Sequence, residues 1–283
     1  MLIVDAHPHI YSADEKRYPP IEKPLRPPPG SGAVEKLRQE MKAAGVAKAV
    51  VIQTSTFYRW DNRFILDTVA ANRQWCAGVV TLDPDAPHSA DILYAAVHKY
   101  GVRGLRSIAA ADGSFDHPGV RRLWQEARSL GIVVNALSDR AEVAPQLARL
   151  LQEFSGLPVV LDHCLSLATG EKYEAKLRAT LELAKHRNLH AKLTFIPTGS
   201  AQEHPFRDMW DAAKRIIAAY GPNRCVWGSD FPLPLWAPKC SYAQHLRLFT
   251  HELGLSTAEQ EAILGVTASK LWFKEGADLG TDV

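Results

Sequence analysis

The chain has 283 residues, of which 46% are hydrophobic, and its 33 basic and 31 acidic residues give a formal net charge of +2. This balance argues against a nucleic-acid or membrane-surface protein, which would carry a marked excess of basic residues. No apolar run approaches the length needed to cross a bilayer. The four cysteines form no CxxC pair, and the first residues show no basic stretch followed by an apolar core. We therefore expect a cytoplasmic protein with reduced thiols that acts on a small molecule.

Eight short apolar segments rich in β-branched residues recur along the chain, and most are followed by a segment with helical spacing. Near-continuous apolar runs of this kind are typical of strands that are buried on both faces of a parallel sheet. We expect strands within residues 2–7, 47–55, 76–83, 102–107, 132–137, 158–164, 189–195 and 224–230.

The segments between these strands carry signals for the ends of helices. Apolar residues at helical spacing, with a glycine at or near the end of the segment, predict helices within residues 31–45, 89–101, 117–131 and 205–222. A last helix is expected over residues 256–273. It begins at Ser256, a residue type that commonly caps helix N-termini.

Eight strands that alternate with helices favour a closed (β/α)8 barrel over an open doubly wound sheet. A dinucleotide-binding sheet would need a GxGxxG motif after a strand, and the sequence has none. We see no internal repeat and no linker, so the interpretation is one α/β domain, a (β/α)8 (TIM) barrel over residues 1–283.

Two long proline-rich segments follow expected strand ends. Residues 11–32 contain the run PPIEKPLRPPPG, and residues 231–241 contain three prolines. Because the active site of such a barrel is built from the loops at the carboxyl ends of its strands, both segments are placed to restrict access to a site. A stiff covering loop without a chemical role is the alternative.

Polar residues with ligand or acid–base chemistry stand at the ends of several expected strands. The first strand ends in IVDAHPHI, with His7 and His9 one residue apart, so the two imidazoles would share a face. The sixth strand ends at His163 and the eighth at Asp230. A barrel brings strand ends together, and three imidazoles with one carboxylate can bind a divalent metal or activate water.

Other polar residues near strand ends leave alternatives open. Lys192 could bind a substrate anion or lower the pKa of a neighbour, or form a structural ion pair. Asp162 precedes His163, and alternation would turn it to the opposite face, which favours a packing or supporting role. Ser55 could donate to a substrate oxygen but has no GxSxG elbow around it. Tyr58, Trp60 and Trp236 could line a pocket or pack within a lid.

The motifs DAHPH, VVIQTS, AGVVTLDP, GVRGLRS, VVLDHC and WGSDFP, spread over nearly the whole chain, resemble those of the "amidohydrolase 2" group of TIM-barrel metal-dependent hydrolases. The LDH of the sixth strand looks most like the branch of 2-pyrone-4,6-dicarboxylate lactonase and the sugar lactonases. The resemblance implies that Asp230 is the general base toward the attacking water. It also implies that His7, His9 and His163 surround the scissile carbonyl, through a metal or by direct hydrogen bonds.

Some features depart from that family pattern. The fifth strand ends in Asn135, where decarboxylases of the wider group usually have a histidine, and it has no lysine to bridge two metals. A single zinc or manganese ion would have to use His7, His9 and Asp230, with His163 as a further candidate, and a metal-free mechanism stays open.

Few arginines are placed to bind substrate. The pyrone lactonase holds two substrate carboxylates with arginines, whereas this chain keeps Arg106, with Arg59 as a possible substitute or a solvated loop residue. A dicarboxylate substrate is therefore not favoured.

The leading hypothesis is a hydrolase that opens a lactone or a related bond with an Asp-activated water. A metal-dependent non-oxidative decarboxylase of the same barrel family is the alternative, and a barrel that only binds a ligand ranks last. The sequence does not decide whether the chain forms a homo-oligomer.

Overall fold

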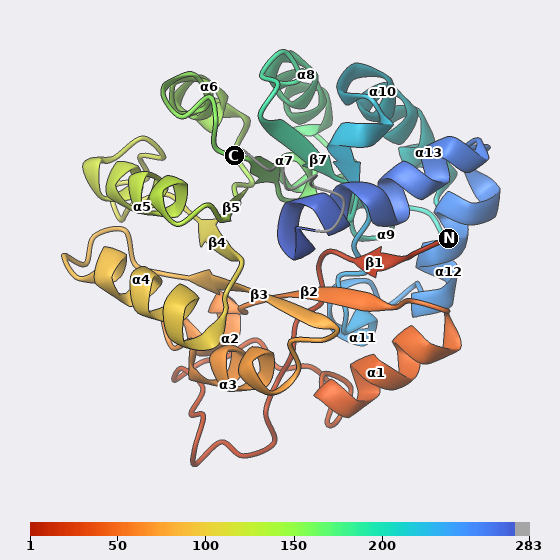
Figure 1. Ribbon diagram of the computed structural model, residues 1–283. Coiled ribbons are helices and arrows are strands. Elements are labelled where there is room, and N and C mark those ends of the chain that lie inside the picture. Colours follow the sequence, from red (N-terminus) through yellow and green to blue (C-terminus); the bar gives the residue numbers. More distant parts are fainter. Residues whose placement is uncertain (275–283) are drawn as a thin grey trace, which may run out of the picture.

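The structure is a computed structural model that describes residues 1–274. Eight parallel strands form one sheet in the order β1 to β8, so each strand pairs with its neighbours in sequence. The sheet curls, and its helices lie outside it (Figure 1). The strands are β1 Val4–Asp5, β2 Lys48–Ile52, β3 Cys76–Thr81, β4 Gly104–Ser107, β5 Val133–Ala136, β6 Val159–Leu161, β7 Leu189–Lys192 and β8 Cys225–Val226.

Each strand lies within the segment predicted from the apolar runs, and the five predicted helices are also present. The helices are α1 Val34–Ala43, α2 Ser55–Tyr58, α3 Arg63–Ala71, α4 Ser89–Tyr100, α5 Pro118–Ser129, α6 Ala144–Glu153, α7 His163–Ser166, α8 Tyr173–Leu183, α9 Phe195–Gly199, α10 Trp210–Tyr220, α11 Leu233–Trp236, α12 Tyr242–Arg247 and α13 Thr257–Glu261. The predicted terminal helix starts at the Ser256 cap, which forms a capping box with Glu259. It continues from α13 through wider turns at Ala262–Val266 and Ser269–Phe273.

Two apolar layers hold the sheet in place. The larger one lies between the strands and the surrounding helices. A smaller cluster on the concave side contains side chains such as Val50, Val79, Val160 and Val226, together with Trp272 from the end of the chain. This concave cluster fills the interior of the curled sheet below the carboxyl ends of its strands.

No β1–β8 ladder is assigned in the described part of the chain, so the sheet is a curled eight-stranded parallel sheet with an α/β-barrel order of elements. Segments that follow these two strands are nevertheless joined by backbone hydrogen bonds. The Ala6 N–H donates to the Trp227 carbonyl over 3.1 Å, and the His9 N–H donates to the Phe231 carbonyl over 2.7 Å. The first and last strands therefore place their following loops side by side.

Within residues 1–274, no helix is both long enough and apolar enough to cross a membrane.

Candidate active site

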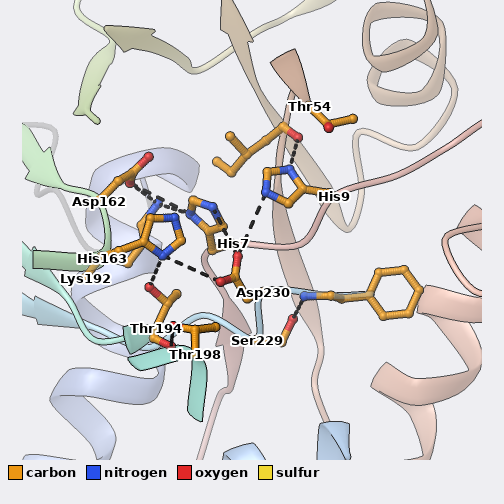
Figure 2. A network of polar contacts seen from close by, with 12 residues as sticks. His7, His9, Thr54, Asp162, His163, Lys192, Thr194, Thr198, Ser229 and Asp230 are labelled. Atoms are coloured by element: carbon orange, nitrogen blue, oxygen red, sulfur yellow. Dashed lines mark hydrogen bonds and ion pairs between the residues drawn. The ribbon is translucent and has the colours of Figure 1, made fainter. Parts of the chain in front are cut away.

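Two histidines near the start of the chain and one from its middle face one carboxylate. His7 Nε2 is 3.6 Å and His9 Nε2 is 3.9 Å from Asp230 Oδ1, while His163 Nδ1 is 3.6 Å from Asp230 Oδ2. Figure 2 shows the Asp230 carboxylate between the imidazoles of His9 and His163, with His7 beside it. These separations exceed direct hydrogen-bonding distance and are short enough for one water or one substrate atom to bridge them.

Unusual backbone conformations aim these side chains inward. Asp230 has a φ of +59°, and its N–H donates to the His7 carbonyl over 3.0 Å. Residues 163–166, from His163 on, all have φ between +49° and +64°, which is a left-handed turn made without glycine. Left-handed conformations cost energy for residues with a Cβ, and they concentrate at functional sites. The turn directs His163 toward Asp230.

Each of two histidines is also held through its Nδ1 atom. His9 Nδ1 is 2.8 Å from the Ile52 carbonyl, so Nδ1 carries a proton and donates it, which leaves the Nε2 lone pair of a neutral ring facing Asp230. His163 Nδ1 is 2.6 Å from the hydroxyl of Thr194, which can donate or accept. Both rings are therefore fixed in orientation before any ligand binds.

A layer of polar side chains lies below His7, contributed by four consecutive strands. Asp162 accepts from Lys192 Nζ over 2.8 Å and from Asn135 Nδ2 over 3.1 Å, and lies 3.3 Å from Arg106 Nε. Lys192 Nζ is also 3.0 Å from His7 Nδ1. Together with His7, these four residues connect the segments at the ends of β1, β4, β5, β6 and β7.

The expected orientation of Asp162 is wrong. Asp162 continues the concave face of β6 that Val160 occupies, so its side chain lies in the interior with Lys192. It is His163 that departs from strand alternation, because the strand ends at Leu161 and the left-handed turn begins at His163. The supporting role expected of Asp162 agrees with its contacts.

Burial raises the pKa of Asp230 to about 7, and the negative charge of Asp162 acts in the same direction, while the cations Arg106 and Lys192 oppose the rise. A carboxyl group with a pKa near neutrality can take a proton from water and return it later in a reaction cycle. No hydrogen bond joins this carboxylate to another residue in the described part of the chain, so both of its oxygens are available.

Burial has the opposite effect on the imidazoles. It lowers the pKa of His9 and of His163 to about 3, with Arg106 acting in the same direction. Burial, and then the charge of Lys192, lower the pKa of His7 well below its usual range. All three rings are therefore neutral at physiological pH, when each can act as a hydrogen-bond donor or acceptor but not as a cation.

A cavity of about 350 Å³ opens beside these groups. Its lining is His9, Thr54, Ser55, Thr56, Arg106, Leu137, His163, Ser166, Leu167, Ala168, Thr198, Asp230 and Trp236. Trp236, from the segment 231–241, is one of the lining residues, and its ring lies 5.6 Å from that of His9. This volume suits a small molecule.

Of the four residues suggested for substrate binding, two line the cavity and two do not. Ser55 and Arg106 line the cavity. Lys192 is completely buried below His7 in the ion pair with Asp162. Arg59 is exposed, has its guanidinium 5.7 Å from the Trp60 ring, and is not part of the lining.

Sequence reasoning missed Asp5, which holds the first strand against the loop after β8. The Asp5 carboxylate accepts hydrogen bonds from the His7 N–H, the Ser229 N–H and hydroxyl, and the Tyr242 hydroxyl, over 2.6–3.1 Å. The sequence did hold a signal, since Asp5 is an acidic residue inside the apolar run LIVDAH. A carboxylate buried with such a run needs several hydrogen-bond partners, which points to a structural role. Thr194 was also missed, and nothing in its sequence context distinguishes it.

His7, His163 and Asp230 offer ligand atoms that all lie within 4.8 Å of one another, a spacing that could hold a metal ion. Two nitrogens and one oxygen are suitable ligands for zinc. His9, expected as a ligand, is not in this group. The hydrogen bonding of His7 does not fit a ligand role, however. A metal-bound histidine normally donates its second N–H to an acceptor, whereas His7 Nδ1 faces the ammonium group of Lys192.

A curled parallel sheet with histidines and an acid at the carboxyl ends of its strands is the architecture of a barrel-type hydrolase. The model of the amidohydrolase family matches residues 4–274, and the chain belongs to this family. This confirms the family resemblance seen in the motifs.

Two proteins of known activity are similar to the chain. It is 26% identical over 243 residues to the L-fucono-1,5-lactonase of Burkholderia ambifaria, covering 81% of this chain and 80% of that protein. It is 25% identical over 250 residues to the 2-pyrone-4,6-dicarboxylate hydrolase of Comamonas testosteroni, covering 82% and 77%. An amidohydrolase structure from Burkholderia multivorans with bound zinc superposes with a TM-score of 0.76 at 21% identity, covering 96% of this chain and 99% of that one.

Proposed function

We propose that the protein hydrolyses a lactone, with water activated by Asp230. The observation that carries this proposal is the Asp230 carboxylate, which lines the cavity, faces three neutral histidines and has a pKa near neutrality. The similarity to a sugar lactonase and to a pyrone dicarboxylate hydrolase supports a cyclic ester as the substrate.

In the proposed reaction, the ionised Asp230 takes a proton from a water as the water oxygen attacks the lactone carbonyl. Negative charge then develops on the carbonyl oxygen, and donors from His7 and Arg106 stabilise it. His7 Nε2 and Arg106 Nη2 are 3.5 Å apart, so both groups are close enough to face one oxygen atom. When the ring C–O bond breaks, Asp230 returns its proton to the leaving alkoxide, and the products are the free carboxylate and alcohol of one open chain.

The cavity lining restricts the substrate. Arg106 is the one lysine or arginine among the lining residues described, and Asp162 partly neutralises it. The lining also includes five residues with neutral hydroxyl groups, beside apolar side chains such as Leu137 and Trp236; the five are Thr54, Ser55, Thr56, Ser166 and Thr198. The lactone therefore carries at most one carboxylate, in agreement with the prediction that a dicarboxylate is not favoured.

A divalent ion such as zinc or manganese, if one binds, would be held by His7, His163 and Asp230, where it would polarise a carbonyl or lower the pKa of water. The contact between Lys192 and His7 opposes this use, and the mechanism above does not need the ion.

Product analysis tests the proposed function. The purified protein is incubated with sugar lactones and simple γ- and δ-lactones, and in parallel with carboxylated phenols. Release of acid from a lactone, lost in the Asp230→Asn variant, is the expected result. Release of carbon dioxide from a carboxylated phenol would instead establish the decarboxylase alternative.

We also propose that the sheet closes into a (β/α)8 barrel in a single domain, supported by the backbone hydrogen bonds that join the segments after β1 and β8. A cytoplasmic location stays a prediction, and a homo-oligomer stays an open alternative to a single chain.

A further inference from the structure

Lys192 lies at the bottom of the candidate site and contacts three groups. Its Nζ is 2.8 Å from Asp162 Oδ1, 3.0 Å from His7 Nδ1 and 5.5 Å from the centre of the Trp272 ring. The side chain is 0% exposed, so these protein groups take the place of water around it. An ammonium group with one carboxylate, one imidazole nitrogen and one π-face around it has a partner for each of its three N–H bonds.

The contact with His7 fixes where that imidazole carries its proton. Burial lowers the pKa of Lys192, but the ion pair with Asp162 at 2.8 Å favours the charged form. An ammonium group has donors and no acceptor, so Lys192 donates and His7 Nδ1 accepts. The other candidate partner of Nδ1 is Asp162 Oδ1, which at 3.8 Å is too far away to accept a hydrogen bond from it. A neutral His7 whose Nδ1 accepts must carry its proton on Nε2.

The two histidines of the HxH motif are then opposite tautomers. His7 directs an Nε2–H donor toward Asp230, 3.6 Å away. Arg106 Nη2, which can only donate, also lies 3.5 Å from this Nε2 atom. The contact of Lys192 with Nδ1, at 3.0 Å, is the shorter of the two and sets the tautomer. His9 donates its Nδ1–H to the Ile52 carbonyl and directs an Nε2 lone pair toward the same carboxylate. The rings themselves are in contact, with centroids 5.0 Å apart, so one offers a donor and the other an acceptor to whatever binds beside Asp230.

We propose that Lys192 is a positioning residue that fixes His7 as the Nε2–H tautomer, so that His7 acts as a hydrogen-bond donor to the substrate oxygen and not as a metal ligand. The donor role rests on the proposed lactone hydrolysis, whereas the tautomer does not. A metal at His7 Nε2 would require the proton to move to Nδ1, directly against the ammonium group. Without Lys192, Nδ1–H could turn toward the nearby Asp162 carboxylate, which is the usual arrangement behind a metal-bound histidine.

The first test measures the tautomer in the unmodified protein. Nitrogen-15 spectra of protein labelled at histidine, with His7 assigned from the spectrum of a His7→Gln variant, should show Nε2–H and an unprotonated Nδ1. An Nδ1–H signal for His7 would overturn the proposal. This measurement needs no substrate, so failure to find a lactone substrate would count against the proposed function and leave the tautomer assignment intact.

The second test removes the ammonium group with Lys192→Met. Zn²⁺ and Co²⁺ titrations should show metal binding strengthened roughly 10–100-fold, the range by which groups behind metal-bound histidines alter affinity. The kcat for lactone hydrolysis should fall while KM changes little. A matched control is Lys214→Met, because Lys214 also lies over an indole ring, 5.8 Å from Trp210, but on the exposed side of α10. Unchanged metal affinity in a folded Lys192→Met protein would contradict the proposal.

Discussion

Ser229 donates both its backbone N–H, over 2.8 Å, and its hydroxyl, over 2.6 Å, to the carboxylate of Asp5, although 224 residues separate the two. This pair joins β1, which His7 and His9 follow, to the loop that carries Asp230. The site therefore depends on a contact between the first strand and the segment that follows the last strand.

Replacing Asp5 with alanine should destabilise the fold. Four donors would lose a buried acceptor, and we expect the free energy of unfolding to fall by about 3 kcal/mol or more, since bonds to charged groups are worth about 1.5–3 kcal/mol each and are not additive. Chemical denaturation measures the change. Asp14→Ala is the control, because Asp14 is exposed and, in the described part of the chain, its carboxylate accepts a hydrogen bond only from the Arg17 N–H. Equal stability of the two variants would show that the Asp5 contacts contribute little.

Strand positions and much of the site could be predicted because both follow from local sequence. Apolar runs locate β1 to β8, and the end of a parallel strand is a defined place, so His7 and Asp230 could be expected to meet. Which side chains face inward after a strand ends could not be predicted. His163 reaches the site through a left-handed turn that contains no glycine, so the sequence gives no signal for it.

The buried contacts of Lys192 could not be predicted from the sequence either. Its sequence context allowed an ion pair, a substrate contact or an effect on a neighbour. Only the tertiary arrangement shows that it pairs with Asp162 and contacts His7 at the same time. Long-range polar contacts of this kind leave no periodic signal in the sequence.

Asp230→Asn should separate activity from stability. We expect turnover of a lactone to fall roughly 10²–10⁴-fold, the usual contribution of a general base. Stability at neutral pH should be unchanged or higher, because the substitution removes a carboxyl group whose ionised form is disfavoured by burial. Steady-state kinetics and thermal unfolding check the two effects. Asp211→Asn, on the exposed surface of α10, should change neither. Near-normal turnover in Asp230→Asn would remove the general-base role.

The rate should rise with pH through the pKa of Asp230. The base works in its ionised form, so activity should be low below about pH 6 and reach a plateau above about pH 8, with a midpoint near the pKa of about 7. A pH series of kcat/KM measures the midpoint in the free enzyme. Residual activity of Asp230→Asn should lack this transition. The same transition in that variant would assign it to another group.

Activity should survive removal of divalent metals. If Lys192 holds His7 as a donor, dialysis against a chelator should leave lactone hydrolysis within about twofold of its starting value, because the carbonyl oxygen is stabilised by hydrogen bonds. Metal analysis of the dialysed protein confirms the removal. Loss of activity that zinc or manganese restores would contradict both the metal-free mechanism and the role assigned to Lys192.

Acid should destabilise the protein through its buried histidines. The pKa values of His9 and His163 are lowered to about 3 and that of His245 to about 4, whereas an unfolded chain protonates histidine near about pH 6.5. Between these limits the unfolded state binds more protons, so stability falls as pH falls.

Asp230 acts in the opposite sense, because its raised pKa makes the folded state bind the extra proton between about pH 4 and 7. Several histidines outweigh one carboxyl group, and we expect the free energy of unfolding to fall by at least about 1.4 kcal/mol per pH unit below pH 6, the contribution of one fully shifted group. In Asp230→Asn the opposing contribution is gone, so its stability should fall more steeply over the same range. Urea denaturation of both proteins from pH 7 to pH 4 measures the two slopes, and a flat profile for the unmodified protein would show that these imidazoles are not held neutral.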